Sequence, residues 1–178
     1  MIDLANQGFP AAQQAMGEMY LTGNGVEKND ELAYHWFKRA ITNGSVEAQF
    51  HIGRIYAQQK DEASQIQAME HYHIAAQNGV ARAQFHLGQM AYLGHFVEKD
   101  NSNALAWFTL AAENGYAPAQ YNVALMHYKG IAVEQDLGAA LDWMNKACEA
   151  QFKKSCEAVS DLTQRLAAIH DSESYLSE

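Results

Sequence analysis

The sequence predicts an all-α protein built from stacked antiparallel helix pairs. A block that begins Ala-Gln recurs at residues 12, 48, 83 and 119, so its starts are separated by 36, 35 and 36 residues. A second block begins with alanine at residues 33, 68, 104 and 140, and in three of its four copies a tryptophan follows three residues later. A period of this length is typical of two-helix repeats that bury their apolar faces against the neighbouring repeat.

Four such repeats account for most of the 178-residue chain. We expect a single repeat solenoid over residues 1–170, with a flexible acidic tail at 171–178. Residues 155–170 continue the register of the first block but have no second helix after them, so they are expected to form a C-terminal capping helix. The repeats are predicted at about 12–47, 48–82, 83–118 and 119–154.

The first helix of each repeat is predicted from apolar residues at helical spacing, such as Ala12, Met16 and Met19. In three repeats a glycine ends this helix, and a valine three residues later inserts the loop into the core. An asparagine or aspartate then stands where it can cap the second helix, at Asn29, Asp100 and Asp136. The second repeat lacks the loop glycine and is one residue shorter, so we expect longer helices or a looser loop there.

Glycines occur at two kinds of position. The Asn-Gly pairs at 43–44, 78–79 and 114–115 suit a left-handed cap at the end of a second helix. Other glycines lie inside the predicted first helices, where each costs about 1 kcal/mol relative to alanine. We expect a close helix crossing against the alanines of the second helix to offset that cost, and tryptophans to fill the core between repeats. The residues concerned are Gly17, Gly53 and Gly88, then Ala33, Ala68, Ala104 and Ala140, and finally Trp36, Trp107 and Trp143.

Charge and hydropathy exclude some classes of partner. The chain has 12 Lys and Arg against 21 Asp and Glu, a formal charge of −9, which disfavours binding to nucleic acid. No run approaches the roughly 18 to 20 apolar residues that cross a bilayer, so membrane insertion is not expected. The first residues show no secretion signal, which indicates a cytoplasmic protein for the chain as given. Because residues 4–8 are similar to the end of a second helix, the chain also fits a fragment of a longer array, and then a periplasmic or secreted location fits equally.

The repeat motif resembles that of a known family. It combines an alanine, an apolar residue followed by glycine, and a tyrosine, as in Ala12, Met16-Gly17 and Tyr20, with the loop and the Ala-x-x-Trp block described above. This pattern looks like the Sel-1-like repeat, a relative of the tetratricopeptide repeat, over residues 12 to about 154. The resemblance implies a right-handed α/α superhelix that binds other proteins, often as an adaptor or scaffold, and that has no catalytic residues and no cofactor.

The resemblance also implies where a partner would bind. In the tetratricopeptide geometry, equivalent positions of the first helices form ladders along the concave face, with aromatic, arginine and amide side chains suited to a peptide. Because the chain is acidic, the expected partner is a peptide or domain that is basic or of mixed charge. The alternative is that the aromatic residues of this face cover the core and bind nothing. The candidate binding residues are Gln14, Glu18, Phe50, His51, Arg54, Phe85, His86, Gln89, Tyr121 and Asn122, with Leu125, Tyr92 and Tyr128 further along.

No catalytic or metal-binding motif is visible. His51 and His86 are ladder neighbours, but packed helices lie about 10 Å apart, too far for these two residues to share an ion. His-Glu-x-x-His and Cys-x-x-Cys spacings are absent from the sequence. We therefore expect no catalytic residue, no metal and no cofactor.

Two cysteines, Cys148 and Cys156, flank the turn between the last repeat and the capping helix. Their positions face each other across a short antiparallel turn, so a disulfide worth about 2 kcal/mol is plausible, and two free thiols fit equally. A secreted, cysteine-rich bacterial branch of the resembled family bridges cysteines at this spacing, and some of its members bind or hydrolyse β-lactams. The alternative function is therefore a secreted, cysteine-bridged protein with penicillin-binding or β-lactamase-type activity, although the chain has one such pair.

Overall fold

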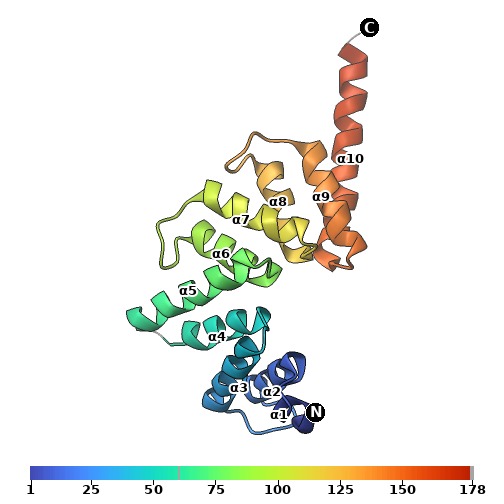
Figure 1. The fold of residues 1–178 in the computed structure, drawn as a ribbon. Coiled ribbons are helices and arrows are strands. Elements are labelled where there is room, and N and C mark those ends of the chain that lie inside the picture. The colour runs from blue at the N-terminus through green and yellow to red at the C-terminus, as the bar shows by residue number, and fades with distance from the viewer. Residues whose placement is uncertain (60, 177–178) are drawn as a thin grey trace. The chain divides into compact units, whose positions relative to one another are not determined.

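The computed structural model describes residues 1–59 and 61–176, and this part of the chain forms ten helices and no strand (Figure 1). Eight of the helices form four consecutive pairs, with one helix before them and one after. The fold is therefore the all-α array of helix pairs that the repeat predicts. The helices are α1 (Ile2–Asn6), α2 (Pro10–Thr22), α3 (Asp30–Thr42), α4 (Glu47–Ala57), α5 (Glu62–Gln77), α6 (Ala81–Leu93), α7 (Asn101–Glu113), α8 (Ala117–Lys129), α9 (Leu137–Glu149) and α10 (Lys153–Leu176).

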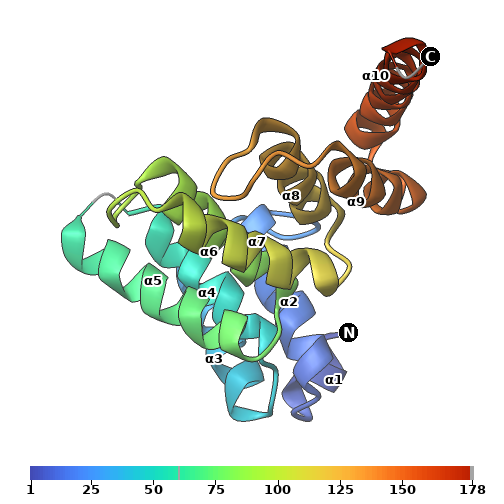
Figure 2. The same ribbon diagram turned by 90° about the horizontal axis from the view of Figure 1, so that it is seen from above.

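The chain divides into two compact units where the sequence suggested one solenoid. The N-terminal unit is Met1–Leu87 and the C-terminal unit is Gly88–Glu178, so the boundary falls inside α6. In the N-terminal unit α2 packs on α3, α3 on α4, and α4 on α5. In the C-terminal unit α7 packs on α8, α8 on α9, and α9 on α10, as Figure 2 shows from above. Each unit thus repeats the same arrangement of consecutive helices.

The capping helix is longer than expected. It runs over Lys153–Leu176, so it starts two residues before 155 and continues six residues past 170 into the segment predicted to be a tail. No glycine or proline occurs between 153 and 176, and nothing else in that sequence stops a helix. Residues 177 and 178 lie outside the described residues.

The predicted caps of the second helices are confirmed. Asn29 Oδ1 accepts a hydrogen bond from the Leu32 amide at 2.9 Å, and Asp136 and Asp100 cap α9 and α7 in the same way. The divergent second repeat has its own cap, because Asp61 accepts from the Ser64 amide at 2.9 Å. Its α5 has 16 residues, three more than the other second helices, whereas its α4 has only 11. Only the second of its two helices is therefore longer.

The two kinds of glycine have different physical reasons. Gly44, Gly79 and Gly115 have φ of +95°, +82° and +79°, and a Cβ added there would contact nothing within 4 Å. These positions require a left-handed backbone, as predicted. Inside the first helices the reason is space, because a Cβ on Gly17 would lie 2.6 Å from the ring of Phe37.

The residue that faces each helical glycine corrects our expectation. The glycines pack mainly against the ring four residues after the predicted alanine: Gly53 against Tyr72, with a Cβ at 2.8 Å, and Gly88 against Phe108, at 2.6 Å. At Gly53 the predicted alanine also takes part, because a Cβ there would lie 3.1 Å from the backbone oxygen of Ala68. The fourth repeat replaces both partners, because Ala124 and Met144 take these positions and share one core cluster. In the fourth repeat the first helix thus has alanine instead of glycine, and the second helix has methionine instead of an aromatic ring.

The residues of the second helices that fill the core lie one position after the repeat position of the tryptophans that were predicted to do so. Phe37, Tyr72 and Phe108 are buried, whereas Trp36, one position earlier, is only partly buried and carries the guanidinium of Arg39 at 4.5 Å from its ring centroid. Successive residues of a helix point about 100° apart, so a shift of one position moves a ring from the core to its edge. The tryptophans therefore cover the core instead of filling it.

Buried glutamines join consecutive repeats. Nε2 of Gln13 donates to the backbone oxygen of Ala5 at 3.0 Å, and Gln84 and Gln120 make the same bond eight residues back along the chain. Each bond adds a side-chain donor from the first turn of one helix to a carbonyl in the last turn of the helix before it, and that carbonyl also accepts from the amide of the following glycine. Three of the four Ala-Gln blocks thus fasten the turn before them, whereas Oε1 of Gln49 in the second block lies 2.6 Å from Nδ1 of His71.

Candidate protein-interaction surface

Seven of the ten predicted partner-binding residues lie in the N-terminal unit, on α2, α4 and α6. Two of them, Phe50 and His51, are buried, with 2% and 1% of their surface exposed. They belong to the core and offer no surface to a partner, which corrects the prediction for these two side chains. The remaining five are partly exposed: Gln14, Glu18, Arg54, Phe85 and His86.

His51 is held between an aromatic ring and a carboxylate. Its ring stacks on Phe37, with centroids 4.8 Å apart and planes 5° from parallel, and its Nε2 lies 3.0 Å from Oε1 of Glu18 without the alignment of a hydrogen bond. Burial lowers the pKa of His51, against the opposing effect of Glu18. The imidazole is therefore neutral at neutral pH and acts as a packing group.

His86 has the same role one repeat later. Its ring stacks on Tyr72, with centroids 5.5 Å apart and planes 11° from parallel, and it also lies 5.4 Å from the ring of Phe50. Burial lowers the pKa of His86, and burial raises the pKa of Tyr72 to about 12. Both groups therefore stay uncharged at neutral pH.

The exposed part of this face in the N-terminal unit is polar and charged. Arg82 forms an ion pair with Glu47, and its guanidinium lies 5.5 Å from the ring centroid of Phe50. Gln14 donates to Glu18 at 3.1 Å and accepts from the hydroxyl of Ser45 at 2.9 Å. The surface therefore presents both signs of charge over a layer of buried aromatic rings.

The C-terminal unit contains a groove of its own. It encloses about 110 Å³. Asn122 lines it, as do Tyr92 and Leu125, which were expected further along the binding face, whereas Gln89 and Tyr121 do not. The ring of Tyr121 lies 5.5 Å from that of Phe152 instead. Four of the seven lining residues are apolar, and Lys129 is the one charged side chain among them. The lining residues are Tyr92, Phe108, Asn122, Leu125, Met126, Lys129 and Ile131.

Comparison with known families accounts for the repeats. The model of the Sel1 repeat matches four times, at residues 10–45, 46–80, 81–116 and 117–152. The chain belongs to the Sel1 repeat family. Each match begins two residues before the corresponding repeat proposed from the sequence alone. Sel1 repeats generally form protein-interaction scaffolds without enzymatic activity.

Solved structures with this fold come from several bacteria. The protective antigen c5321 of uropathogenic Escherichia coli strains, described as an SLR fold, is 31% identical with a TM-score of 0.79, over 97% of this chain and 37% of that one. A Sel1 repeat protein from Oxalobacter formigenes is 33% identical with a TM-score of 0.75, over 89% of this chain and 46% of that one. This chain therefore spans less than half the length of either protein.

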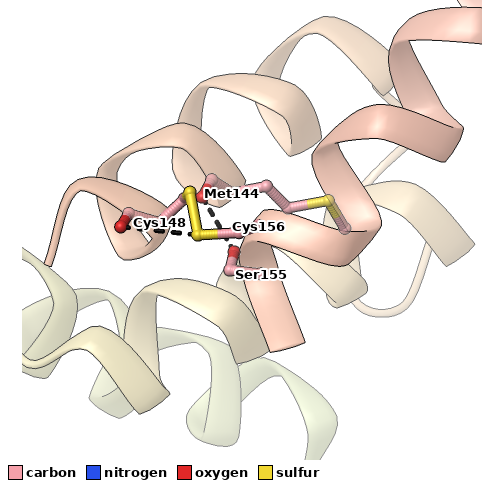
Figure 3. The surroundings of a disulfide bond; sticks show 4 residues. All are labelled: Met144, Cys148, Ser155 and Cys156. Carbon is pink, nitrogen blue, oxygen red and sulfur yellow. Dashed lines mark hydrogen bonds between the residues drawn. A yellow bond between two sulfur atoms is a disulfide. The ribbon is translucent and has the colours of Figure 1, made fainter. Parts of the chain in front are cut away.

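The two cysteines of this Sel1 repeat chain form a disulfide, which joins α9 to α10 (Figure 3). The hydroxyl of Ser155, beside the bridge, donates to the backbone oxygen of Met144 at 2.8 Å and fastens the same two helices. Cysteine rich protein B of Helicobacter pylori is 17% identical with a TM-score of 0.55, over 70% of this chain and 96% of that one. That likeness concerns the fold alone.

Two further observations limit the chemistry of the described residues. They contain no group of three or more His, Cys, Asp and Glu side chains arranged to hold a metal ion. Within the same part of the chain, every helix is too short or too polar to cross a bilayer.

Sequence reasoning missed part of the groove in this Sel1 repeat array. Four lining residues were not among the candidates, because the candidates came from one face of the first helices. They are Phe108 of α7, Met126 and Lys129 of α8, and Ile131 of the following loop. One signal was available. Asn122 stands at the repeat position of His51 and His86, so the sequence already showed a smaller side chain there.

Proposed function

We propose that this Sel1 repeat chain is a non-enzymatic protein-interaction module that binds a peptide or a partner domain on the face formed by the first helices of its repeats. The observation that carries the proposal is the groove of the C-terminal unit, which combines apolar walls with the amide of Asn122 and the ammonium of Lys129. Peptide recognition uses this combination, because an apolar pocket anchors a side chain and polar groups bind the peptide backbone.

The charge of the chain sets the kind of partner that this function requires. A formal charge of −9 attracts a basic or mixed-charge protein and repels an acidic one at long range. The exposed groups of the N-terminal unit, which include Glu18 and the Arg82–Glu47 pair, fit a partner of mixed charge. The disulfide does not favour the enzymatic alternative, because it supplies no catalytic group.

Affinity capture tests the proposed function. The chain with Tyr92→Ala, Asn122→Ala and Lys129→Ala, three exposed or partly exposed residues of the first helices that line the groove, is compared with the unaltered chain in extracts of the cells that make it. Phe50 and His51 are left intact because they are buried. A control with Gln67→Ala, Glu113→Ala and Asp142→Ala changes exposed residues of the second helices.

The expected result is a partner retained by the unaltered chain and the control but lost by the first variant. Circular dichroism and thermal unfolding must first show that both variants are folded. Equal capture by all three proteins would contradict a binding site on the first-helix face. Capture of no partner by any of them would contradict the interaction function itself.

A further inference from the structure

The groove of the C-terminal unit lies where other repeats carry a stacked histidine. His51 stacks on Phe37, and His86 stacks on Tyr72, in each case a core ring 14 residues earlier in the chain. The residue 14 positions after the equivalent core ring, Phe108, is Asn122. Both residues line the groove. The same repeat position therefore holds an imidazole ring in the second and third repeats and a smaller amide side chain in the fourth.

The size of the groove limits what it can hold. Its 110 Å³ is smaller than an apolar cavity of about 150 Å³, which accepts a molecule the size of benzene. A leucine, isoleucine, valine or methionine side chain therefore fits, whereas an indole does not. Phe108, Leu125 and Met126 supply the apolar walls for such a side chain, and the half-exposed amide of Asn122 can bond the adjoining peptide group.

The charged side chain that lines the groove is opposite in sign to the net charge of the whole chain. Lys129 is exposed and lines the groove, and no acidic residue is among the seven that line it. A second ammonium group, Lys99 Nζ, lies 5.6 Å from the ring centroid of Tyr92, another lining residue. Two cations beside an apolar pocket favour a ligand with a carboxylate next to its apolar group.

We infer that this groove accepts one aliphatic side chain of a bound peptide with an aspartate or glutamate beside it, and that Asn122 keeps the groove open by replacing the stacked histidine of the second and third repeats. The inference rests on the proposed function and specifies its ligand. A partner that is basic or mixed in overall charge would present a local acidic–aliphatic segment at this place.

The decisive variant is Asn122→His, which introduces the residue that two other repeats already accommodate. We expect it to fill the groove and to leave thermal stability equal or higher, because it fills space beside Phe108. Lys99→Ala and Lys129→Ala test the charge. Lys28→Ala is the matched control, because Lys28 occupies the same repeat position as Lys99 but lies in the N-terminal unit.

The probe is a phage-displayed library of random dodecapeptides, selected on the purified full chain and followed by fluorescence anisotropy with the enriched peptides. We expect enriched peptides to pair an aliphatic residue with Asp or Glu. Asn122→His should weaken their binding at least about tenfold, because the buried anchor is lost. Each of the two groove lysine variants should weaken it about two- to fivefold, more at low salt, and Lys28→Ala should not change it.

The outcomes separate the groove from the proposed function. Enriched peptides that bind Asn122→His as tightly as the unaltered chain would overturn the groove while leaving an interaction module. Peptides that depend on Asn122 but carry aromatic or basic residues in place of the acidic–aliphatic pair would overturn the ligand class. No enrichment, together with a partner captured from extract, would overturn the groove alone, and no enrichment with no captured partner would overturn both.

Discussion

Gln120 Nε2 donates a buried hydrogen bond of 3.1 Å to the backbone oxygen of Ala112, eight residues earlier. After the last repeat, Cys156 stands at the position of Gln120 and Cys148 at that of Ala112, and the two cysteines are bonded to each other. The disulfide therefore takes the place of the glutamine bond that joins the third and fourth repeats. Both devices fasten the end of one helix to the start of the next.

Replacing Gln120 with alanine should destabilise the C-terminal unit by about 0.5–1.5 kcal/mol, because one buried hydrogen bond is lost while the Ala112 oxygen keeps its bond from the Gly115 amide. Urea unfolding followed by circular dichroism measures the change in the free energy of unfolding. Gln135→Ala is the control, since Gln135 makes a similar bond of 2.8 Å to the backbone oxygen of Tyr128 at an exposed site. A loss for Gln120→Ala no larger than that of the control would contradict a structural role for the buried bond.

Reduction of the disulfide should lower the free energy of unfolding by about 2 kcal/mol, since the bridge closes a short loop and restricts the unfolded chain. Urea unfolding with and without reductant measures this difference. The repeat pattern suggests that a glutamine hydrogen bond can replace the disulfide. Cys148→Ala with Cys156→Gln recreates the Ala112–Gln120 pair, and it should be about 1 kcal/mol more stable than the double alanine variant. Equal stability of the two variants would show that the glutamine bond cannot form at this turn.

The period of the sequence was sufficient to predict the helices, the loops and the caps at Asn29, Asp100 and Asp136, because these depend on residues close together in the chain. Which side of each helix faces the core depends on packing, and the sequence placed Trp36 there instead of Phe37. The groove was harder to foresee, since it arises where residues of α6, α7 and α8 meet. A ladder of equivalent positions identifies a face, but only the structure shows which of its side chains are buried.

The contact between Gly88 and Phe108 predicts a stability change that a second substitution should reverse. Gly88→Ala places a Cβ about 2.6 Å from the ring and should destabilise by about 1–3 kcal/mol through overpacking. Adding Phe108→Met creates the combination that the next repeat uses, Ala124 with Met144, and should recover most of the loss. Chemical unfolding of the two single variants and the double variant gives the coupling energy. Additive effects would mean that the two positions do not compensate each other.

Phe96 stores strain in the loop between α6 and α7. Its φ is +61° and 56% of its surface is exposed, whereas the equivalent residue of the first repeat is Gly25. A left-handed backbone costs a non-glycine residue about 1–2 kcal/mol, and glycine avoids this cost. Glycine also makes the unfolded chain more flexible, which offsets part of the gain in stability. Phe96→Gly should therefore stabilise the C-terminal unit by about 0.5–1 kcal/mol, measured by thermal unfolding. A variant less stable than the unaltered chain would show that the exposed ring contributes more than the strain costs.

The stability of the N-terminal unit should fall with acidification. His51, His71 and His86 all lie in this unit, and burial lowers the pKa of each. The positive charges of Arg54 and Arg82 lower the pKa of His51 further, and Arg54 does the same at His86. Glu18 and Glu47 raise the pKa of His51, and Glu70 raises that of His71, but burial has the larger effect. The unfolded chain therefore binds more protons than the folded one below a pH of about 6.5, the ordinary pKa of histidine. Stability is fully present above that pH and is lost as the pH falls towards the pKa values of the folded state, by at most about 1.4 kcal/mol per pH unit for each histidine.

Urea unfolding at a series of pH values between about 7.5 and 5 measures this dependence. His86→Phe keeps a ring that can stack on Tyr72 but removes one titrating group, so its stability should depend less steeply on pH. Because acidification also protonates carboxylates, the difference between this variant and the unaltered chain isolates the histidine. Parallel pH profiles for the two proteins would contradict the conclusion that His86 resists protonation because it is buried in the folded state.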